Sequence, residues 1–117
     1  MKIIGIIPAR MAASRFPGKP LHNIIDRPML SHVWQRAKLY NNWDYLSIAT
    51  CDKEILEYSN KNNFECMMTG SHHTRALDRV AEAITKLGNI EINDEDIIVN
   101  VQGDEPMIHP EMFDVLI

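Results

Sequence analysis

The chain has 117 residues, of which 45% are hydrophobic and 24% charged, and its formal net charge is -4 at pH 7. These values are typical of one globular domain with a single core, and they exclude a disordered chain and a basic nucleic-acid-binding face. No apolar run approaches the roughly 20 residues that cross a bilayer, and the first apolar run is too short for a secretory signal. We therefore predict a cytoplasmic protein that binds neither nucleic acid nor membrane.

The first 20 residues carry the strongest local signal. Residues 3–7 form a short apolar run interrupted by one glycine, which predicts a buried strand. The segment 2–20 holds four of the 12 Lys and Arg residues and none of the 16 acidic residues. Three of those four cations lie in the loop after the predicted strand: Arg10, Arg15 and Lys19.

A cationic loop in this position predicts a site for an anion, and in particular for a polyphosphate. Ligands of open α/β sheets bind beyond the carboxyl ends of the strands. Arg grips phosphate oxygens with its planar fork, and Lys supplies a point charge. An ordinary loop with solvated side chains is the alternative. Three prolines restrict the backbone here and favour a built site: Pro8, Pro17 and Pro20.

Two common phosphate-binding motifs do not fit this segment. Gly18 and Lys19 match the end of a P-loop, G-x-x-x-x-G-K-[ST]. However, Ala13 and Pro20 occupy the positions of its first glycine and its hydroxyl residue. The dinucleotide fingerprint G-x-G-x-x-G also fails, because no glycine lies between Gly5 and Gly18. The sequence therefore argues against a P-loop and against NAD binding of that type.

After the basic loop, the pattern predicts a short extended piece and then a helix. Residues 21–25 are predicted to be extended and to end in a turn at Asp26 and Arg27. Pro28 is placed as the first residue of an amphipathic helix that runs to about Tyr40. Apolar residues recur at spacings of three and four along this helix, which predicts one buried face.

A second helix is predicted between two further strands. Residues 45–50 (YLSIAT) form the first of these strands, and residues 65–69 form a weaker one. Asp52 is placed as the N-cap of the helix, which continues to about Asn62.

The last third of the chain repeats the alternation. Residues 70–74 form a loop by composition, and the helix after it ends at Gly88. Five apolar residues are predicted to share one face of that helix: Leu77, Val80, Ala81, Ile84 and Leu87. Residues 96–101 predict a strand that leads into a loop at 102–106. Pro110 opens a final helix that reaches the end of the chain without a cap, so we expect a truncated chain.

This order of elements predicts an α/β fold, a three-layer αβα arrangement around a mainly parallel sheet, with residues 1–117 in one domain. In such a sheet the loops after the first and last predicted strands can both lie along the carboxyl edge. The acidic residues Asp104 and Glu105 would then lie near the basic loop. Cys51 and Cys66 form neither a C-x-x-C pair nor a disulfide framework, and we predict reduced thiols.

Two stretches resemble one enzyme family. The sequences IIPARMAASRFPGKPL at residues 6–21 and NVQGDEPMI at residues 100–108 are similar to motifs of the 3-deoxy-manno-octulosonate (Kdo) cytidylyltransferases. The resemblance covers the amino-terminal part of that family and implies a Rossmann-like nucleotide-diphospho-sugar transferase fold. It also implies a CMP-sugar synthetase that transfers CMP from CTP to Kdo or a close relative, for lipopolysaccharide or surface-glycan synthesis.

The resemblance assigns the nucleotide-binding residues. Pro8, Ala9 and Arg10 match the P-A-R stretch that holds the cytosine base in the family. Arg15 and Lys19 match the residues that meet the triphosphate. These assignments agree with the anion site predicted from the charge pattern.

The resemblance also assigns a metal. Asp104 matches the metal-binding aspartate of the family, which implies Mg2+, and Gln102 lines the site beside it. Mg2+ prefers carboxylate and phosphate oxygens and takes few protein ligands. Ser14 matches a small hydroxylated position close to the phosphates. Without the resemblance, a Gly-Asp-Glu-Pro segment would be interpreted as a plain turn.

A third motif matches only in part. The family shows a histidine loop followed by S-G-T-D-R, whereas this chain has Arg-Ala-Leu before Asp78 and Arg79. The resemblance implies that these two residues help to hold the nucleoside. His72 and His73 are adjacent, not three or four residues apart as on a helix face, so we interpret them as loop residues and not as zinc ligands.

The implied mechanism is attack of the anomeric hydroxyl of the sugar acid on the α-phosphate of CTP, without a covalent enzyme intermediate. Arg15, Lys19 and Asp104 are the predicted catalytic residues, acting by alignment and charge neutralisation. Full-length members of the family pair as homodimers. Two alternatives stay open: a non-catalytic nucleotide-binding domain, and a cytidylyltransferase for another acidic sugar such as an amino-Kdo or a sialic-acid-like compound.

Overall fold

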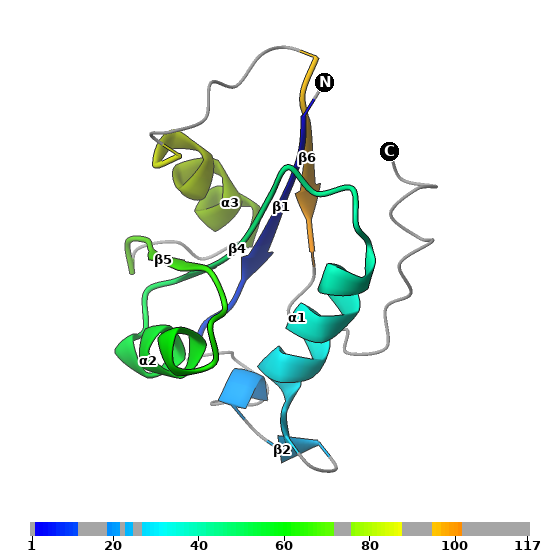
Figure 1. The fold of residues 1–117 in the computed structure, drawn as a ribbon. Helices are drawn as coiled ribbons and strands as arrows, with labels where there is room; N and C mark the ends of the chain where they lie inside the picture. Colours follow the sequence, from blue (N-terminus) through cyan, green and yellow to red (C-terminus); the bar gives the residue numbers. More distant parts are fainter. Residues whose placement is uncertain are drawn as a thin grey trace.

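A four-stranded parallel sheet forms the centre of the structure, which is a computed structural model (Figure 1). It describes residues 2–11, 19–21, 23–24, 27–71, 76–87 and 95–101, with backbone alone for Lys19, Asn23, Ile24, Ala76 and Leu77. The strand order is β5-β4-β1-β6, and each neighbouring pair is parallel. The strands are β1 (Ile3–Pro8), β4 (Tyr45–Thr50), β5 (Cys66–Met68) and β6 (Ile97–Asn100).

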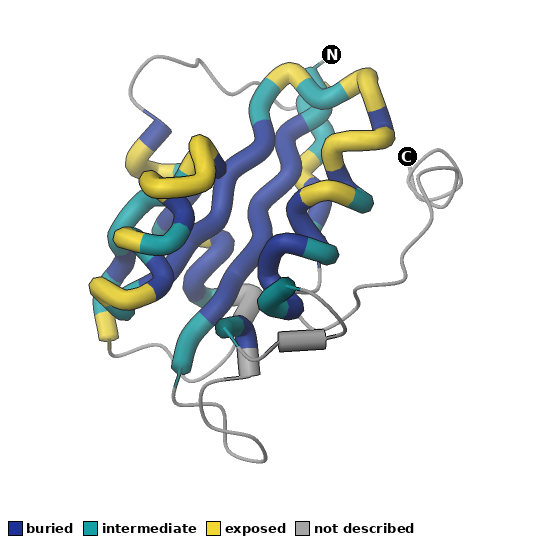
Figure 2. The backbone as a smooth tube through the Cα atoms, turned by 60° about the horizontal axis from the view of Figure 1, so that its bottom comes forward, coloured by how far each residue is buried: buried dark blue, intermediate teal, exposed yellow. Residues whose placement is uncertain are grey.

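Helices cover both faces of this sheet, as predicted. They are α1 (Met29–Leu39), α2 (Lys53–Lys61) and α3 (Ala76–Thr85). One core cluster joins α1 and α2 to one face of the sheet, and a second cluster joins α3 to the other. Figure 2 shows the strands as a buried layer with the exposed turns outside it. The three-layer αβα architecture with a parallel sheet is therefore confirmed.

The apolar run that opens the chain is buried on both of its sides. Ile4 and Ile6 pack in the cluster under α3, whereas Ile7 packs in the cluster under α1 and α2. All three side chains are fully buried. A strand with helices on both faces needs no polar alternation, which is why this run is almost continuously apolar.

Gly5 interrupts that run because of a close approach by another residue. A Cβ atom at this position would lie 2.7 Å from Cζ3 of Trp43 and 2.8 Å from Cδ1 of Leu46. The indole of Trp43 is held in place, since its Nε1–H donates a 2.8 Å hydrogen bond to the carbonyl oxygen of Ala37. The missing side chain thus makes room for Trp43 against the sheet.

The helix α1 also contacts α2 and the residues just after it on one face of the sheet. The rings of Trp34 and Phe64 stack with centroids 5.0 Å apart, and the ring of Tyr58 meets Phe64 edge-on at 6.1 Å. Ser31 and Tyr58 share a hydrogen bond between their hydroxyl groups. The apolar residues that recur at spacings of three and four along α1 are all buried, as predicted: Met29, Leu30, Val33, Trp34 and Ala37.

The segment before α1 differs from its prediction. Lys19–Leu21 forms a 3-10 helix, so Leu21 is not extended. Asn23–Ile24 (β2) pairs antiparallel with Arg27–Pro28 (β3), which places Arg27 in a short strand and not in a turn. Pro28 is the N-cap of α1 and not its first helical residue.

The predicted face of α3 is correct for Val80 and wrong for one residue. Ala81 is exposed, whereas Ala83 is fully buried between α3 and the sheet. Leu87 is buried but lies beyond the end of the helix at Thr85. Gly88 and the final helix predicted from Pro110 lie outside the described residues.

The structure also bears on the two cysteines and on membrane-spanning helices. Cys51 and Cys66 are both free, as predicted for reduced thiols. Within the described ranges, no helix is long and apolar enough to span a membrane.

Candidate functional site

The exits of β1 and β6 lie side by side at the carboxyl edge of the sheet. The backbone N–H of Val101, just after β6, donates a 2.9 Å hydrogen bond to the carbonyl oxygen of Ile6 in β1. The chain leaves β1 toward α1 on one face and enters β6 after α3 on the other. The pair β1 and β6 is therefore the point at which the winding of the sheet reverses, where ligands of open α/β sheets bind (Figure 1).

The backbone that leaves β1 is fixed to the end of β4. The N–H of Ala9 donates to the carbonyl oxygen of Ala49 at 3.0 Å, which continues the β1–β4 pairing by one residue. The N–H of Met11 donates to Oδ2 of Asp52 at 2.8 Å. Arg10, the first cation of the predicted basic loop, lies half-buried between these two anchored residues.

Pro8 and Ala9 are placed at this edge but turn their side chains into the protein. Both are buried, and Ala9 belongs to the core cluster under α1 and α2. Since the N–H of Ala9 is already bonded to β4, contacts of this stretch with a ligand would come from the remaining backbone groups and from Arg10. The role predicted for Pro8, Ala9 and Arg10 stays a prediction.

A buried arginine lies at the other end of the carboxyl edge, where the chain leaves β5. Arg79 in α3 is 2% exposed, and its Nη1 donates to Oγ1 of Thr69 and, at 3.2 Å, to the carbonyl oxygen of Gly70. Its Nη2 is buried without a hydrogen-bond partner in the described part of the chain. Asp78, beside it in the first turn of α3, is half-buried. Arg79 therefore holds the chain that leaves β5.

Two more side chains, one in α3 and one just after its end, hold the same backbone. The carboxylate of Glu82 accepts the N–H of Gly70 at 2.9 Å, and Nζ of Lys86 donates to the carbonyl oxygen of Met68 at 2.8 Å. Glu82 and Lys86 also form an ion pair at 3.0 Å. With Arg79, they fix the start of the loop that leads from β5 to α3.

One cation of the first segment lies away from this edge. Nζ of Lys2 is 3.3 Å from Oδ2 of Asp96, and the backbone N–H of Lys2 donates to Oδ1 of the same residue at 2.8 Å. These contacts join β1 to β6 at the amino edge of the sheet. Lys2 therefore belongs to the scaffold, and the predicted ligand site depends on the remaining three cations.

Several predicted site residues lie outside the described residues: Ser14, Arg15, Gln102 and Asp104, together with the side chain of Lys19. The structure describes the chain on both sides of the basic loop, up to Met11 and again from Lys19. It also describes the strand before the acidic loop, whose last residue, Asn100, has a buried Oδ1 without a partner in the described part. In the described ranges no group of three or more His, Cys, Asp or Glu residues could hold a metal ion.

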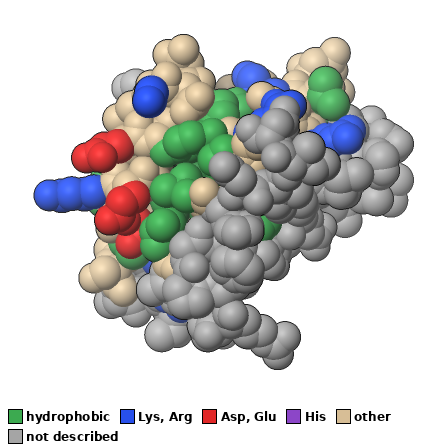
Figure 3. All heavy atoms as spheres, turned by 90° about the horizontal axis from the view of Figure 1, so that it is seen from below, with side chains coloured by type: hydrophobic (Ala, Val, Ile, Leu, Met, Phe, Trp, Pro, Cys, Tyr) green, Lys and Arg blue, Asp and Glu red, His purple; other side chains and the backbone are tan. Residues whose placement is uncertain are grey.

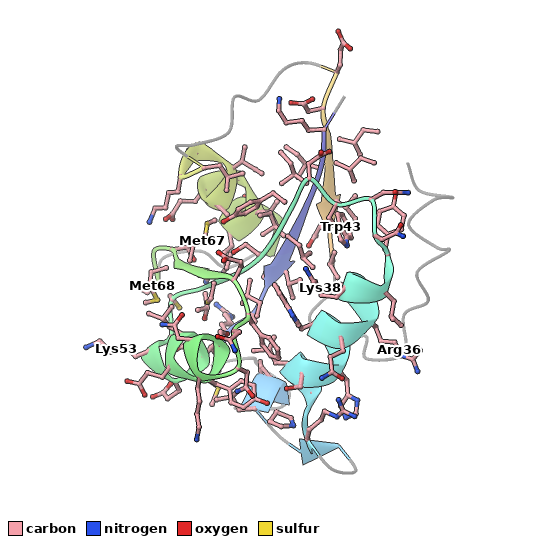
Figure 4. All side chains as sticks on the ribbon, in the orientation of Figure 1. Arg36, Lys38, Trp43, Lys53, Met67 and Met68 are labelled. Atoms are coloured by element: carbon pink, nitrogen blue, oxygen red, sulfur yellow. The ribbon has the colours of Figure 1, made fainter. Side chains whose placement is uncertain are left out.

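The surface at the carboxyl edge combines apolar and charged side chains. Figure 3 views the molecule from the side toward which the strands β1 and β6 point in Figure 1. Hydrophobic side chains gather there in one patch; acidic and basic side chains lie together on one flank of it, and further basic side chains lie on the other. In contrast, Figure 4 shows the side chain of Arg36 pointing away from the sheet on the outer side of α1.

Sequence reasoning missed the residues that hold the site in place. Asp52 was predicted as an N-cap, and it does occupy that position, but its side chain makes no cap hydrogen bond to α2. Glu82 and Lys86 were not singled out at all. Their spacing of four residues is a signal for an ion pair on a helix, but it carries no information about Gly70 or Met68.

Comparisons with known proteins agree with the family resemblance of the two motifs. A family model described as cytidylyltransferase matches residues 4–117. The 3-deoxy-manno-octulosonate cytidylyltransferase of Nitratidesulfovibrio vulgaris (strain DP4) is 47% identical over 113 residues, which are 97% of this chain and 44% of that protein. The chain therefore spans a little under half the length of this curated relative.

Solved structures share the fold. A CMP:2-keto-3-deoxy-manno-octonic acid synthetase in complex with CTP has a TM-score of 0.88 and 35% identity, and the match covers 99% of this chain and 46% of that one. A Mycobacterium tuberculosis protein in complex with manganese has a TM-score of 0.68 at 15% identity over 99% of this chain and 58% of that one, a likeness of fold alone. The predicted nucleotide-diphospho-sugar transferase fold is confirmed.

Proposed function

The chain belongs to the cytidylyltransferase family, and from this premise we propose that the whole protein transfers CMP from CTP to an acidic sugar. The sugar is Kdo or a close relative, and pyrophosphate is the second product. The 47% identity to a Kdo cytidylyltransferase supports this choice of substrate. Residues 1–117 would supply the nucleotide-binding part of the enzyme. The product would serve lipopolysaccharide or surface-glycan synthesis, and we expect the reaction in the cytoplasm.

The observation that carries this proposal is the pairing of β1 with β6. The two motifs that resemble the family begin in these strands, and the hydrogen bond from Val101 to Ile6 joins the strands at their carboxyl ends. A basic loop and an acidic loop that start from neighbouring strands can approach one triphosphate from two sides. A nucleotide with a bound metal ion satisfies the charges of both loops.

In the proposed mechanism, the anomeric hydroxyl of the sugar acid attacks the α-phosphate of CTP and pyrophosphate leaves. Arg15 and Lys19 would bind the phosphates and neutralise charge that develops in the transition state. Arg10, with Pro8 and Ala9, would orient the cytosine base, and alignment would supply much of the rate enhancement. These roles are proposals for the basic loop and its stem.

The second group of proposed residues surrounds the metal. Asp104 would hold Mg2+, since a carboxylate is a ligand type that this ion prefers, and Gln102 would line the site beside it. When bound, the ion polarises phosphate oxygens and offsets their charge. Ser14 would donate to a phosphate oxygen, and Asp78 would contact the nucleoside.

Pyrophosphate release tests the proposal directly. We expect the purified full-length gene product to release pyrophosphate when CTP, Mg2+ and Kdo are all present, and mass spectrometry should detect CMP-Kdo. Omission of any one of the three should stop the release. Equal release with an unrelated sugar phosphate in place of Kdo would contradict the proposal.

The choice of sugar is a separate question, because this chain has Arg75, Ala76 and Leu77 where the family shows S-G-T. Ala76 and Leu77 lie in the first turn of α3, close in sequence to the fixed end of β5. A panel of Kdo, an amino-Kdo and a sialic-acid-like sugar separates the candidates by their kcat/KM values. We expect the largest value for Kdo.

A further inference from the structure

Two aspartates on either side of β4 hold the start of β1 and the chain just beyond its end. Oδ2 of Asp44, before β4, accepts the N–H of Ile3 at 2.7 Å. Oδ2 of Asp52, after β4, accepts the N–H of Met11 at 2.8 Å. The two bonds are alike in chemistry, but Asp44 acts at the amino edge of the sheet and Asp52 at the carboxyl edge. Only the second bond lies beside the candidate site.

The side chain of Asp52 accepts the N–H of Met11 and makes no hydrogen bond to the first turn of its own helix, α2. Asp52 is the N-cap residue of α2 and has an extended backbone, yet it makes no side-chain cap hydrogen bond. An aspartate in that position ordinarily accepts an N–H from the first turn of the helix. Here Oδ2 faces Met11, and Sγ of Cys51 approaches the same oxygen at 3.8 Å. Asp52 thus occupies a helix-cap position, but its carboxylate binds the backbone after β1 and not the backbone of α2.

The contact restricts the residue between the two anchors. Arg10 has its preceding neighbour tied to Ala49 and its following neighbour tied to Asp52. The backbone on both sides of Arg10 is thus fixed to β4 and to the residue that follows it closely. As a result, the position of the Arg10 Cα atom, from which the side chain starts, is fixed as well. The same bond sets the direction in which the chain enters the basic loop.

We propose that Asp52 is a positioning residue for nucleotide binding, which acts through the N–H of Met11 by holding Arg10 and the start of the basic loop in the binding arrangement. This inference rests on the proposed function. Without the acceptor, the backbone at Arg10 and Met11 would sample other arrangements, and the apparent affinity would fall in proportion to the fraction of molecules in the binding-competent one. Asp44 makes the equivalent bond 41 residues after Ile3, far from the site, and provides a matched control.

The test compares CTP binding by full-length variants in the presence of Mg2+, measured by calorimetry. Asp52→Ser removes the carboxylate from Met11, while serine is a good N-cap and keeps α2 stable. We expect CTP to bind about tenfold more weakly, which corresponds to the loss of one charge-assisted hydrogen bond from the binding arrangement. Asp52→Asn keeps an acceptor oxygen of the same reach and should remain within about threefold of the wild type.

Asp44→Ser separates positioning from stability. It removes the equivalent bond at the other edge, so it should lower the melting temperature but leave CTP affinity unchanged. Two results would overturn the role of Asp52: an Asp52→Ser variant that binds CTP as tightly as the wild type, or an Asp44→Ser variant that loses as much CTP affinity as Asp52→Ser. In both cases, CTP binding by the wild type would still support the proposed function. A wild-type protein that binds no CTP would overturn both.

Discussion

The N–H of Val101 donates a hydrogen bond to the carbonyl oxygen of Ile6 at 2.9 Å, across the boundary between the last and first strands of the sheet. These residues are far apart in the sequence but mark the points from which the acidic and basic loops depart. Because the strands are parallel, both loops leave from the same edge. The proposed nucleotide site depends on this relationship more than on any single side chain.

Arg79→Ala should destabilise the protein by about 2 to 3 kcal/mol, because it removes the donor from the buried Oγ1 of Thr69 and from the carbonyl oxygen of Gly70. Urea denaturation followed by circular dichroism measures the change. Arg36→Ala, on the outer side of α1, is the control and should stay within about 0.5 kcal/mol of the wild type. Equal stability of the two variants would mean that the buried guanidinium adds nothing to the fold.

Stability should fall at alkaline pH in a way that depends on Cys66. Burial raises the pKa of the Cys66 thiol. The folded state therefore holds this proton more tightly than the unfolded state does. The resulting stabilisation is complete below the ordinary pKa of a thiol, about 8.5, and is lost as the pH rises through the higher pKa of the folded state.

The measurement is the free energy of unfolding in urea between pH 7 and pH 10, compared with the variant Cys66→Ser. The wild type should lose more stability than the variant over this range. Parallel pH profiles would contradict a raised pKa. Alkylation provides a second readout: in the variant Cys51→Ser, the remaining thiol should react more slowly in the folded protein than in urea.

Lys19→Ala should weaken CTP binding by about 1.5 to 3 kcal/mol, the range of one hydrogen bond to a charged group. Calorimetric titration of the full-length protein measures this change. Lys61→Ala is the matched control, since Lys61 is exposed in the last turn of α2, at the other end of that helix from the carboxyl edge. If both variants bind like the wild type, Lys19 is an ordinary surface residue.

Asp104→Asn should abolish the dependence of pyrophosphate release on Mg2+, because the amide removes the negative charge that the ion requires. The rate is measured as a function of Mg2+ concentration, and chelation of the metal from the wild type should give a similarly low rate. Glu57→Gln, on the exposed part of α2, should keep the wild-type response. A variant at Asp104 with an unchanged Mg2+ response would place the metal elsewhere.

The sequence was sufficient to predict the elements that are long and buried. Residues 45–50 were predicted as a strand and form β4 with the same bounds, because a strand covered on both faces is a continuous run of apolar and small residues. The buried face of α1 was predicted equally well, since five apolar positions at helical spacing leave one solution. The match to the cytidylyltransferase family also confirms the family suggested by the two motifs.

Short elements and helix rotation were predicted less well. The ladder of β2 and β3 has two residues on each side, too few for any periodic pattern. Ala81 was assigned to the buried face of α3, yet it is exposed while Ala83 is buried. Alanine suits both environments, so its position in the sequence gives a weak signal.

The scaffold of the site depends on contacts between distant residues. An aspartate before a helix has the same local signature whether it caps that helix or, as Asp52 does, accepts the N–H of Met11. In the same way, Arg79 is next to Asp78 in a charged pair that suggests an exposed position, but it is buried against Thr69. Local patterns locate such residues along the chain but do not identify their partners.

A crystal structure of the full-length protein with CTP and Mg2+ tests the central claim most directly. We expect the triphosphate beyond the carboxyl ends of β1 and β6, with Arg15 and Lys19 on its phosphate oxygens and Asp104 on the metal. A structure in which Arg15 and Lys19 lie on the opposite side of the molecule from Asp104 would contradict the account.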